Sequence, residues 1–314
     1  MSIRPVRRVV DAQPTIEGAG VRLHRAFGFG DKNEHDPFLL FDDFRGNHPS
    51  DYSAGFPWHP HRGIETITYV LAGTVDHADS LGNQGQLGAG DVQWMTSGRG
   101  ILHHEMPHGD PAGRMHGFQL WANLPSHLKM SAPRYQDVPS VAIPELREDD
   151  GTVVRVVCGE FWGQRGPVDG IAADPQYLDV WVPPGTRRTL PMDTRRSAFA
   201  YIFEGSGSFR DASDPYGVLE EVDDDVVVRQ SVGNRNLVQF GSGDEVTVTS
   251  GEHGIRFLLV SGKPIEEPVA WYGPIVMNTK QELQQAITEL RAGTLDRKST
   301  RLNSSHGYIS YAVF

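Results

Sequence analysis

The sequence predicts an all-β protein built from two β-barrels and one short helix near its end. Of its 314 residues, 35 are glycine and 21 are proline, which suits short strands joined by tight turns better than long helices. Alternation of β-branched and polar residues, as in Glu65–Leu71, is typical of strands. Two short motifs occur twice: Tyr69–Val75 resembles Tyr201–Gly207, and Leu87–Val92 resembles Phe240–Glu245. The repetition indicates two copies of one β-rich domain, either an antiparallel barrel or a double-sheet sandwich.

We expect the first domain over residues 1–136 and the second over residues 151–293. Between them, Asp137–Gly151 contains prolines and acidic residues that interrupt the alternation, which predicts the linker. The acidic stretch Asp211–Asn236 is expected to be an insertion between strands of the second domain.

A helix is predicted over Thr279–Arg291, because Leu283, Ile287 and Leu290 share one face and Thr279 is a suitable cap. The last segment, residues 296–314, breaks this pattern and resembles the translation of a sequencing-library adapter. We therefore expect it to be an artefact and leave it out of the fold prediction.

The composition, with 38% hydrophobic and 22% charged residues, is that of a globular protein. No run approaches the roughly 18 to 20 apolar residues that a bilayer span needs, so no membrane role is expected, and a cytoplasmic location is the default. Cys158 is the only cysteine, which excludes an internal disulfide and a thiolate metal cluster. The net charge of −11 disfavours direct nucleic-acid binding. A monomer is the expected state.

Histidine is concentrated in the first domain, since eleven of the 13 histidines precede residue 128. His59 and His61 lie two residues apart, so on a strand both rings face the same side, and Pro60 between them fits an edge strand. His103 and Glu105 have the same spacing. If the two pairs lie on neighbouring strands, three imidazoles and one carboxylate converge, a donor set suited to Fe(II) or Mn(II).

Several assignments around these pairs stay open on spacing alone. Glu65 has the same parity as His59 and His61 and is a second candidate for an inward-facing acid. His104 is expected to point to the opposite side of its strand. Apolar side chains near the pairs are candidate walls for a flat ligand, namely Phe56, Trp58, Trp94, Met95 and Phe118.

Four segments together resemble the pirin family of double cupins: His59–Gly73, Gly90–Pro107, Phe118–Pro125 and Pro274–Leu283. The resemblance extends from about Gly20 to Gly293 and implies two stacked cupin barrels, with a mononuclear iron in the first.

The metal ligands that the resemblance implies are His59, His61, His103 and Glu105. In general cupins the carboxylate ligand comes from the same motif as the first histidine pair, where the corresponding residue here is Glu65. The choice between Glu65 and Glu105 is therefore open. We favour Glu105 as the metal ligand and Glu65 as an acid that faces the substrate or supports a ligand. The second domain has no such histidine pair and is expected to bind no metal.

The resemblance implies two alternative functions. Some bacterial pirins are similar to quercetin 2,3-dioxygenases, which suggests an oxidoreductase that opens a planar aromatic substrate with dioxygen, using Glu105 or Glu65 as the proton acceptor. The alternative is a non-enzymatic protein that binds a protein partner according to the oxidation state of its iron. Iron(II) is expected in both cases, although Mn, Co, Ni and Cu suit the same ligands.

Overall fold

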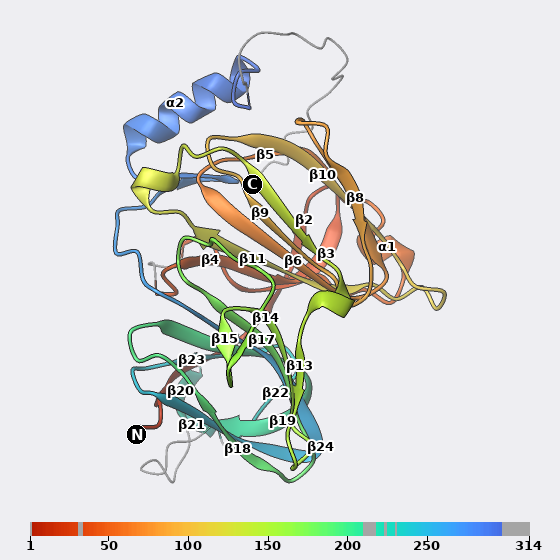
Figure 1. Cartoon of the computed structure of the whole chain (residues 1–314), viewed down its shortest axis with the longest axis vertical. Coiled ribbons are helices and arrows are strands. Elements are labelled where there is room, and N and C mark those ends of the chain that lie inside the picture. Colours follow the sequence, from red (N-terminus) through yellow and green to blue (C-terminus); the bar gives the residue numbers. More distant parts are fainter. Residues whose placement is uncertain (1, 31–33, 210–217, 223–224, 230, 297–314) are drawn as a thin grey trace. The chain divides into compact units, whose positions relative to one another are not determined.

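The computed structural model describes residues 2–30, 34–209, 218–222, 225–229 and 231–296, and it divides into two units (Figure 1). The amino-terminal unit comprises Pro14–Asp31, Phe38–Ser140 and Ile265–Phe314. The carboxy-terminal unit comprises Met1–Gln13, Lys32–Pro37 and Val141–Pro264. The units therefore differ from the continuous domains expected over residues 1–136 and 151–293, because each takes in a segment from the far end of the chain. Most of the proposed adapter segment, residues 297–314, lies outside the described residues.

The amino-terminal unit contains two antiparallel sheets, and apolar side chains from both pack in one buried cluster. The larger has the order β12 (Arg134–Val138), β9 (Val92–Thr96), β6 (Ile64–Ala72), β11 (His116–Asn123), β4 (Phe38–Asp43), β3 (Val21–Phe27) and β2 (Gln13–Glu17). The smaller has the order β5 (Phe56–His61), β10 (Ile101–His108), β7 (Thr74–Asp79) and β8 (Gln84–Leu87). A short helix, α1 (Pro49–Tyr52), precedes β5. Two sheets of this kind form a double-sheet cupin barrel.

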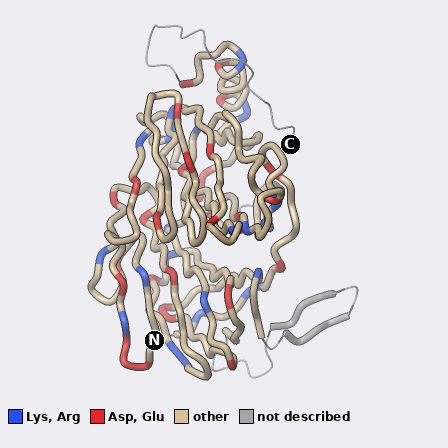
Figure 2. Tube along the Cα trace, turned by 90° about the vertical axis from the view of Figure 1, so that its right-hand side faces the viewer, with Lys and Arg blue, Asp and Glu red and all other residues tan. Residues whose placement is uncertain are grey.

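A carboxy-terminal hairpin and helix complete this unit. The hairpin consists of β25 (Ala270–Tyr272) and β26 (Ile275–Met277), and α2 (Lys280–Arg291) follows it. Its predicted cap is confirmed: the Thr279 hydroxyl accepts a hydrogen bond from the Glu282 amide, and the Glu282 carboxylate accepts one from the Thr279 amide. Ala286 of α2 packs with Ile275, Met277 and Leu295 in a small apolar cluster. The helix carries charged residues of both signs (Figure 2).

The carboxy-terminal unit is built on one nine-stranded sheet. Its main path runs β1 (Val6–Asp11), β23 (Asn236–Phe240), β19 (Ser197–Phe209), β24 (Glu245–Gly262), β17 (Gln176–Val182), β14 (Val153–Cys158) and β13 (Glu145–Arg147). β18 (Arg187–Pro191) pairs with β24, and β22 (Val232–Gly233) pairs with β19. Two hairpins, β15–β16 (Glu160–Phe161, Gln164–Arg165) and β20–β21 (Val218–Val222, Asp225–Arg229), complete the strands.

The predicted all-β class with a late helix is confirmed. Part of the acidic stretch predicted as an insertion, Asp211–Asn236, lies outside the described residues. Cys158 is a buried strand residue, as its apolar neighbours indicate. No helix within the described residues combines the length and the apolar composition needed to cross a bilayer.

Candidate metal centre

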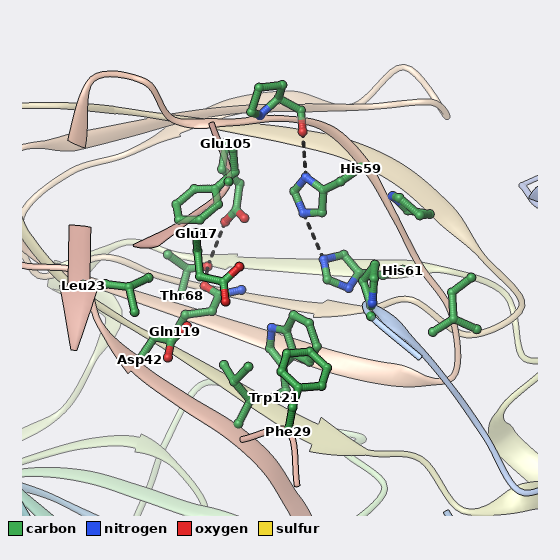
Figure 3. Close-up of a pocket in the computed structure, with 18 of the residues that line it drawn as sticks. Glu17, Leu23, Phe29, Asp42, His59, His61, Thr68, Glu105, Gln119 and Trp121 are labelled. Carbon is green, nitrogen blue, oxygen red and sulfur yellow. Dashed lines mark hydrogen bonds between the residues drawn. The ribbon is translucent and has the colours of Figure 1, made fainter. Parts of the chain in front are cut away.

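Three histidines converge on two neighbouring strands of the small sheet. β5 is the edge strand of that sheet, which explains why Pro60 is tolerated between His59 and His61. His103 on β10 lies directly opposite His59 in the antiparallel register. One ring nitrogen from each histidine lies within 4.8 Å of the others. The predicted convergence of the three imidazoles is therefore present, and Figure 3 shows two of them, His59 and His61, at the cavity.

The burial of these rings keeps them neutral. Burial lowers the pKa of His59 to about 4, and burial together with neighbouring imidazoles lowers the pKa values of His61 and His103 well below 6.5. His59 Nδ1 lies 2.8 Å from the carbonyl oxygen of Pro57 and donates a hydrogen bond to it, so the lone pair of this neutral ring is on Nε2. Neutral imidazoles with lone pairs directed at one point are the form that binds a metal ion.

The arrangement fits a transition-metal ion. Nε2 of His59 and Nε2 of His61 are 3.1 Å apart. Two nitrogens that bind one ion at about 2.1 Å and at right angles are about 3 Å apart. Nε2 of His103 is buried without a hydrogen-bond partner, which is costly unless a further group occupies the cluster. Imidazole donors suit Fe, Co, Ni, Cu or Zn.

Glu105 lies beside this cluster. It follows His103 by two residues on β10, both side chains are buried, and the intervening His104 is only half-buried, as expected for a side chain that faces the other way. Oε2 of Glu105 is 3.8 Å from Nε2 of His103, and the Thr68 hydroxyl lies 3.2 Å from Oε1. Burial raises the pKa of Glu105 to about 7, although the Thr68 hydrogen bond lowers it. Glu105 is thus the predicted acid that lies beside the cluster, although among the described residues the group whose ligand atoms lie within 4.8 Å of one another contains the three histidines and not Glu105.

Glu65 lies elsewhere, which differs from the expectation based on its parity. Thr68 lines the cavity, whereas Glu65, three residues earlier on β6, faces the opposite side of the sheet and accepts a hydrogen bond from Thr96 at 2.7 Å. Burial raises its pKa to about 7. The alternation does not continue from His61 to Glu65 because β5 and β6 are separate strands, joined by a turn at Gly63, whose φ is 78°.

A cavity of about 370 Å³ opens beside the histidines. Of the five apolar residues proposed as its walls, only Phe56 lines it; Trp94, Met95 and Phe118 are buried outside the cavity lining, and Trp58 packs against His104 with ring centroids 4.8 Å apart. Further aromatic walls that were not predicted include Phe29 and Trp121, with ring centroids 6.2 Å apart. Parity along one strand could not show which large side chains reach this space.

The carboxy-terminal hairpin and helix contribute further walls that were not predicted from the sequence. Residues 272–275, Ile287 and Leu290 line the cavity. Backbone hydrogen bonds attach the hairpin to Arg62, which follows His61: the Arg62 amide donates to the Pro274 carbonyl, and the Val276 amide donates to the Arg62 carbonyl. The buried ammonium of Lys129 donates to the carbonyls of Gly63 and Val276 and to the Asn123 side chain.

A row of polar residues in the cavity was also not predicted from the sequence. Thr68, Gln119, Asp42 and Arg25 occupy successive strands β6, β11, β4 and β3 in direct register, and all line the cavity. Burial raises the pKa of Asp42 to about 6, although the hydrogen bonds from Arg25 lower it. This row could have been predicted from one sequence signal, a polar residue at an inward-facing position of a largely apolar strand. Asp42 is such a residue in Phe38–Asp43.

Two cupin domains with a histidine cluster in the amino-terminal unit define a double cupin with a candidate metal centre. Residues 20–122 match the family model described as Pirin, and residues 177–296 match that of the pirin C-terminal cupin domain. The chain belongs to the pirin family.

Several relatives share most of the chain. It is 44% identical over 294 residues to a pirin-like protein of Caulobacter vibrioides, which covers 93% of this chain and 99% of that protein. It is 39% identical over 292 residues to pirin of Homo sapiens, covering 92% and 93% of the two chains. The crystal structure of quercetin 2,3-dioxygenase from Acinetobacter baumannii is similar, with a TM-score of 0.81, 29% identity and coverage of 94% and 99%.

Proposed function

We propose that this chain is a metal-dependent dioxygenase of flavonol-like substrates, with His59, His61, His103 and Glu105 as metal ligands. The observation that carries this proposal is the set of three neutral imidazoles and one carboxylate beside an aromatic-walled cavity. The similarity to the quercetin 2,3-dioxygenase of Acinetobacter baumannii supports the same reaction class.

Iron(II) is the metal that we propose, although the same ligands suit Mn, Co, Ni or Cu. Such an ion, when bound, supplies Lewis acidity toward an anionic oxygen and redox chemistry toward dioxygen. Three neutral imidazoles and one carboxylate leave a divalent ion with one uncompensated positive charge. The site therefore favours a substrate that presents a deprotonated hydroxyl, as an ionised flavonol does.

The residues around the metal centre have distinct roles in this proposal. Glu105 accepts the proton of the substrate hydroxyl, since its carboxylate is buried at the cavity beside His103. The Thr68 hydroxyl, 3.2 Å from Glu105, orients that carboxylate. Phe29 and Trp121 hold the aromatic rings and exclude water. Both atoms of dioxygen enter the products, and carbon monoxide leaves.

The test uses purified protein loaded with iron(II) and a panel of flavonols. We expect oxygen uptake together with loss of the flavonol absorbance, and we expect both to disappear in His61→Ala. His253→Ala is the matched control, because His253 is exposed and belongs to the carboxy-terminal unit. It should keep full activity and full metal content.

No turnover across flavonols and catechols by metal-loaded protein would contradict the proposal. If the same protein then retained a protein partner in only one oxidation state of its iron, the non-enzymatic alternative would replace it. The metal content of the protein must be measured in both the turnover assay and the partner-binding assay, because each result depends on how much of the site is occupied.

A further inference from the structure

The polar row and the metal centre lie on one continuous path of side chains. The row begins at Thr68, whose hydroxyl is 3.2 Å from Glu105 and 2.6 Å from Oε1 of Gln119. Gln119 pairs in register with Asp42, and Asp42 pairs with Arg25. Adjacent strands are about 4.8 Å apart, so the row from β6 to β3 extends roughly 14 Å. This length accommodates a flat ligand of three aromatic rings.

Arg25 is held between two carboxylates at the far end of the row. Its Nε and Nη2 donate to the two oxygens of Asp42, each at 2.8 Å, and its Nη1 lies 2.7 Å from Oε1 of Glu17. All three side chains line the cavity and are at most 16% exposed. One guanidinium against two carboxylates leaves this end with one negative charge, opposite in sign to the end where a divalent ion would lie.

This charged group retains capacity to bind a ligand. A carboxylate has about four acceptor sites, and Arg25 occupies one on Glu17 and two on Asp42. The Glu17 carboxylate lies among the side chains that line the cavity (Figure 3). If the three residues only joined strands β2, β3 and β4, an outward-facing position would serve equally well. Their place on the cavity wall points to recognition of a ligand.

We propose that Glu17 and Asp42 form a distal subsite that accepts hydrogen bonds from phenolic hydroxyls of the substrate and rejects ligands with an anionic far end. The proposal rests on the proposed function, because it takes the anionic oxygen of the same substrate to lie at the metal centre. Phe29 connects the two ends: its ring lies 5.5 Å from the Arg25 guanidinium and packs against Trp121, which contacts His61. The preferred substrate is therefore a flavonol that carries neutral hydroxyls on a ring remote from the metal-binding oxygen.

The test compares two flavonols that share the metal-binding 3-hydroxyl. One is 3-hydroxyflavone, which has no other hydroxyl, and the other is 3,5,7,3′,4′-pentahydroxyflavone. Affinities are measured by calorimetry on full-length, iron(II)-loaded protein at pH 6.5, where the remote phenolic hydroxyls are mostly neutral, and without oxygen, so that no turnover occurs. The variant is Glu17→Gln, and the control is Glu252→Gln, which removes the same charge from an exposed position in the carboxy-terminal unit.

We expect the native protein to bind the pentahydroxy compound at least tenfold more tightly than 3-hydroxyflavone. Glu17→Gln should reduce that preference about tenfold, because hydrogen bonds to ionised groups are the stronger ones. Glu252→Gln should preserve it. The subsite would be overturned if the native protein bound the two flavonols with equal affinity. It would also be overturned if Glu17→Gln left both affinities unchanged or lowered both by the same factor.

The two proposals fail in different ways. If the native protein consumes neither flavonol in the presence of oxygen, the dioxygenase assignment fails. The subsite is still supported in that case if the native protein prefers the pentahydroxy compound and Glu17→Gln loses this preference. If both flavonols are consumed but Glu17→Gln binds them with the native preference, only the subsite fails. Thermal unfolding of each variant shows whether an affinity change comes from loss of the fold.

Discussion

Arg62 and Glu289 form an ion pair in which Nη2 lies 2.7 Å from Oε2. Arg62 directly follows the candidate ligand His61, and Glu289 lies on α2, so the pair links the metal centre to the last helix. The Arg62 side chain is only 4% exposed, and its Nη2 also donates to the Leu295 carbonyl. A buried guanidinium depends on such partners, since its desolvation is costly.

Replacing Glu289 by glutamine tests this link. Glu289→Gln leaves Arg62 without its counter-ion, and because the Glu289 side chain is 29% exposed we expect a modest loss of stability, about 1 kcal/mol. Urea unfolding measures the loss, and faster amide hydrogen exchange in α2 locates it. Glu252→Gln is the control. An unchanged exchange rate in α2 would show that the pair does not hold the helix.

The choice between the two buried acids can be tested by metal content. We expect His103→Ala to lose most of its metal and Glu105→Gln to bind the metal about tenfold to a hundredfold more weakly, whereas Glu65→Gln should retain the native stoichiometry. Mass spectrometry of dialysed protein measures the content, and chelator competition measures the affinity. A native-like Glu105→Gln combined with a metal-free Glu65→Gln would reverse our assignment.

Glu65 should make the stability of the metal-free protein depend on pH. Burial raises its folded-state pKa from 4.5 to about 7, so its contribution to stability is fully present below pH 4.5 and is lost as the pH rises through 7. Relative to the native protein, Glu65→Gln should therefore become more stable by about 2 kcal/mol between pH 5 and pH 8. Urea unfolding at both pH values measures the difference. A difference in unfolding free energy between Glu65→Gln and the native protein that stays constant with pH would contradict the raised pKa of Glu65.

The turn before β6 should tolerate only glycine. A Cβ atom on Gly63 would lie 2.0 Å from the Val276 carbonyl oxygen, and φ is 78°. Gly82 also has a positive φ, 91°, but a Cβ there meets no atom within 4 Å. We expect Gly82→Ala to cost about 1 kcal/mol from backbone strain and Gly63→Ala to cost several kcal/mol more and to displace the hairpin. Thermal unfolding compares them, and equal losses would show that the close approach is unimportant.

The sequence predicted the parts of the site that depend on local spacing. His59 and His61, two residues apart on one strand, must share a face, and the same holds for His103 and Glu105. Parity failed at Glu65 because the chain turns at Gly63 and starts a new strand. Local alternation is informative within a strand and carries no information across a turn.

The rest of the site depends on which strands become neighbours. Thr68, Gln119, Asp42 and Arg25 each add one polar side chain to a different strand, and they form a row only through the strand order of the large sheet. The hairpin residues that line the cavity are more than 150 positions away from the histidines along the sequence. Spacing in one sequence does not determine such contacts.

The order in which the chain is synthesised matters for this cavity. A nascent polypeptide folds from its amino terminus as it leaves the ribosome. The strands that carry the histidines emerge early, but the wall made by the hairpin and α2 arrives only after residue 291 has been translated. During biosynthesis the histidine cluster is therefore open on that side for most of the translation time, which gives a metal ion an entry route before the wall is in place.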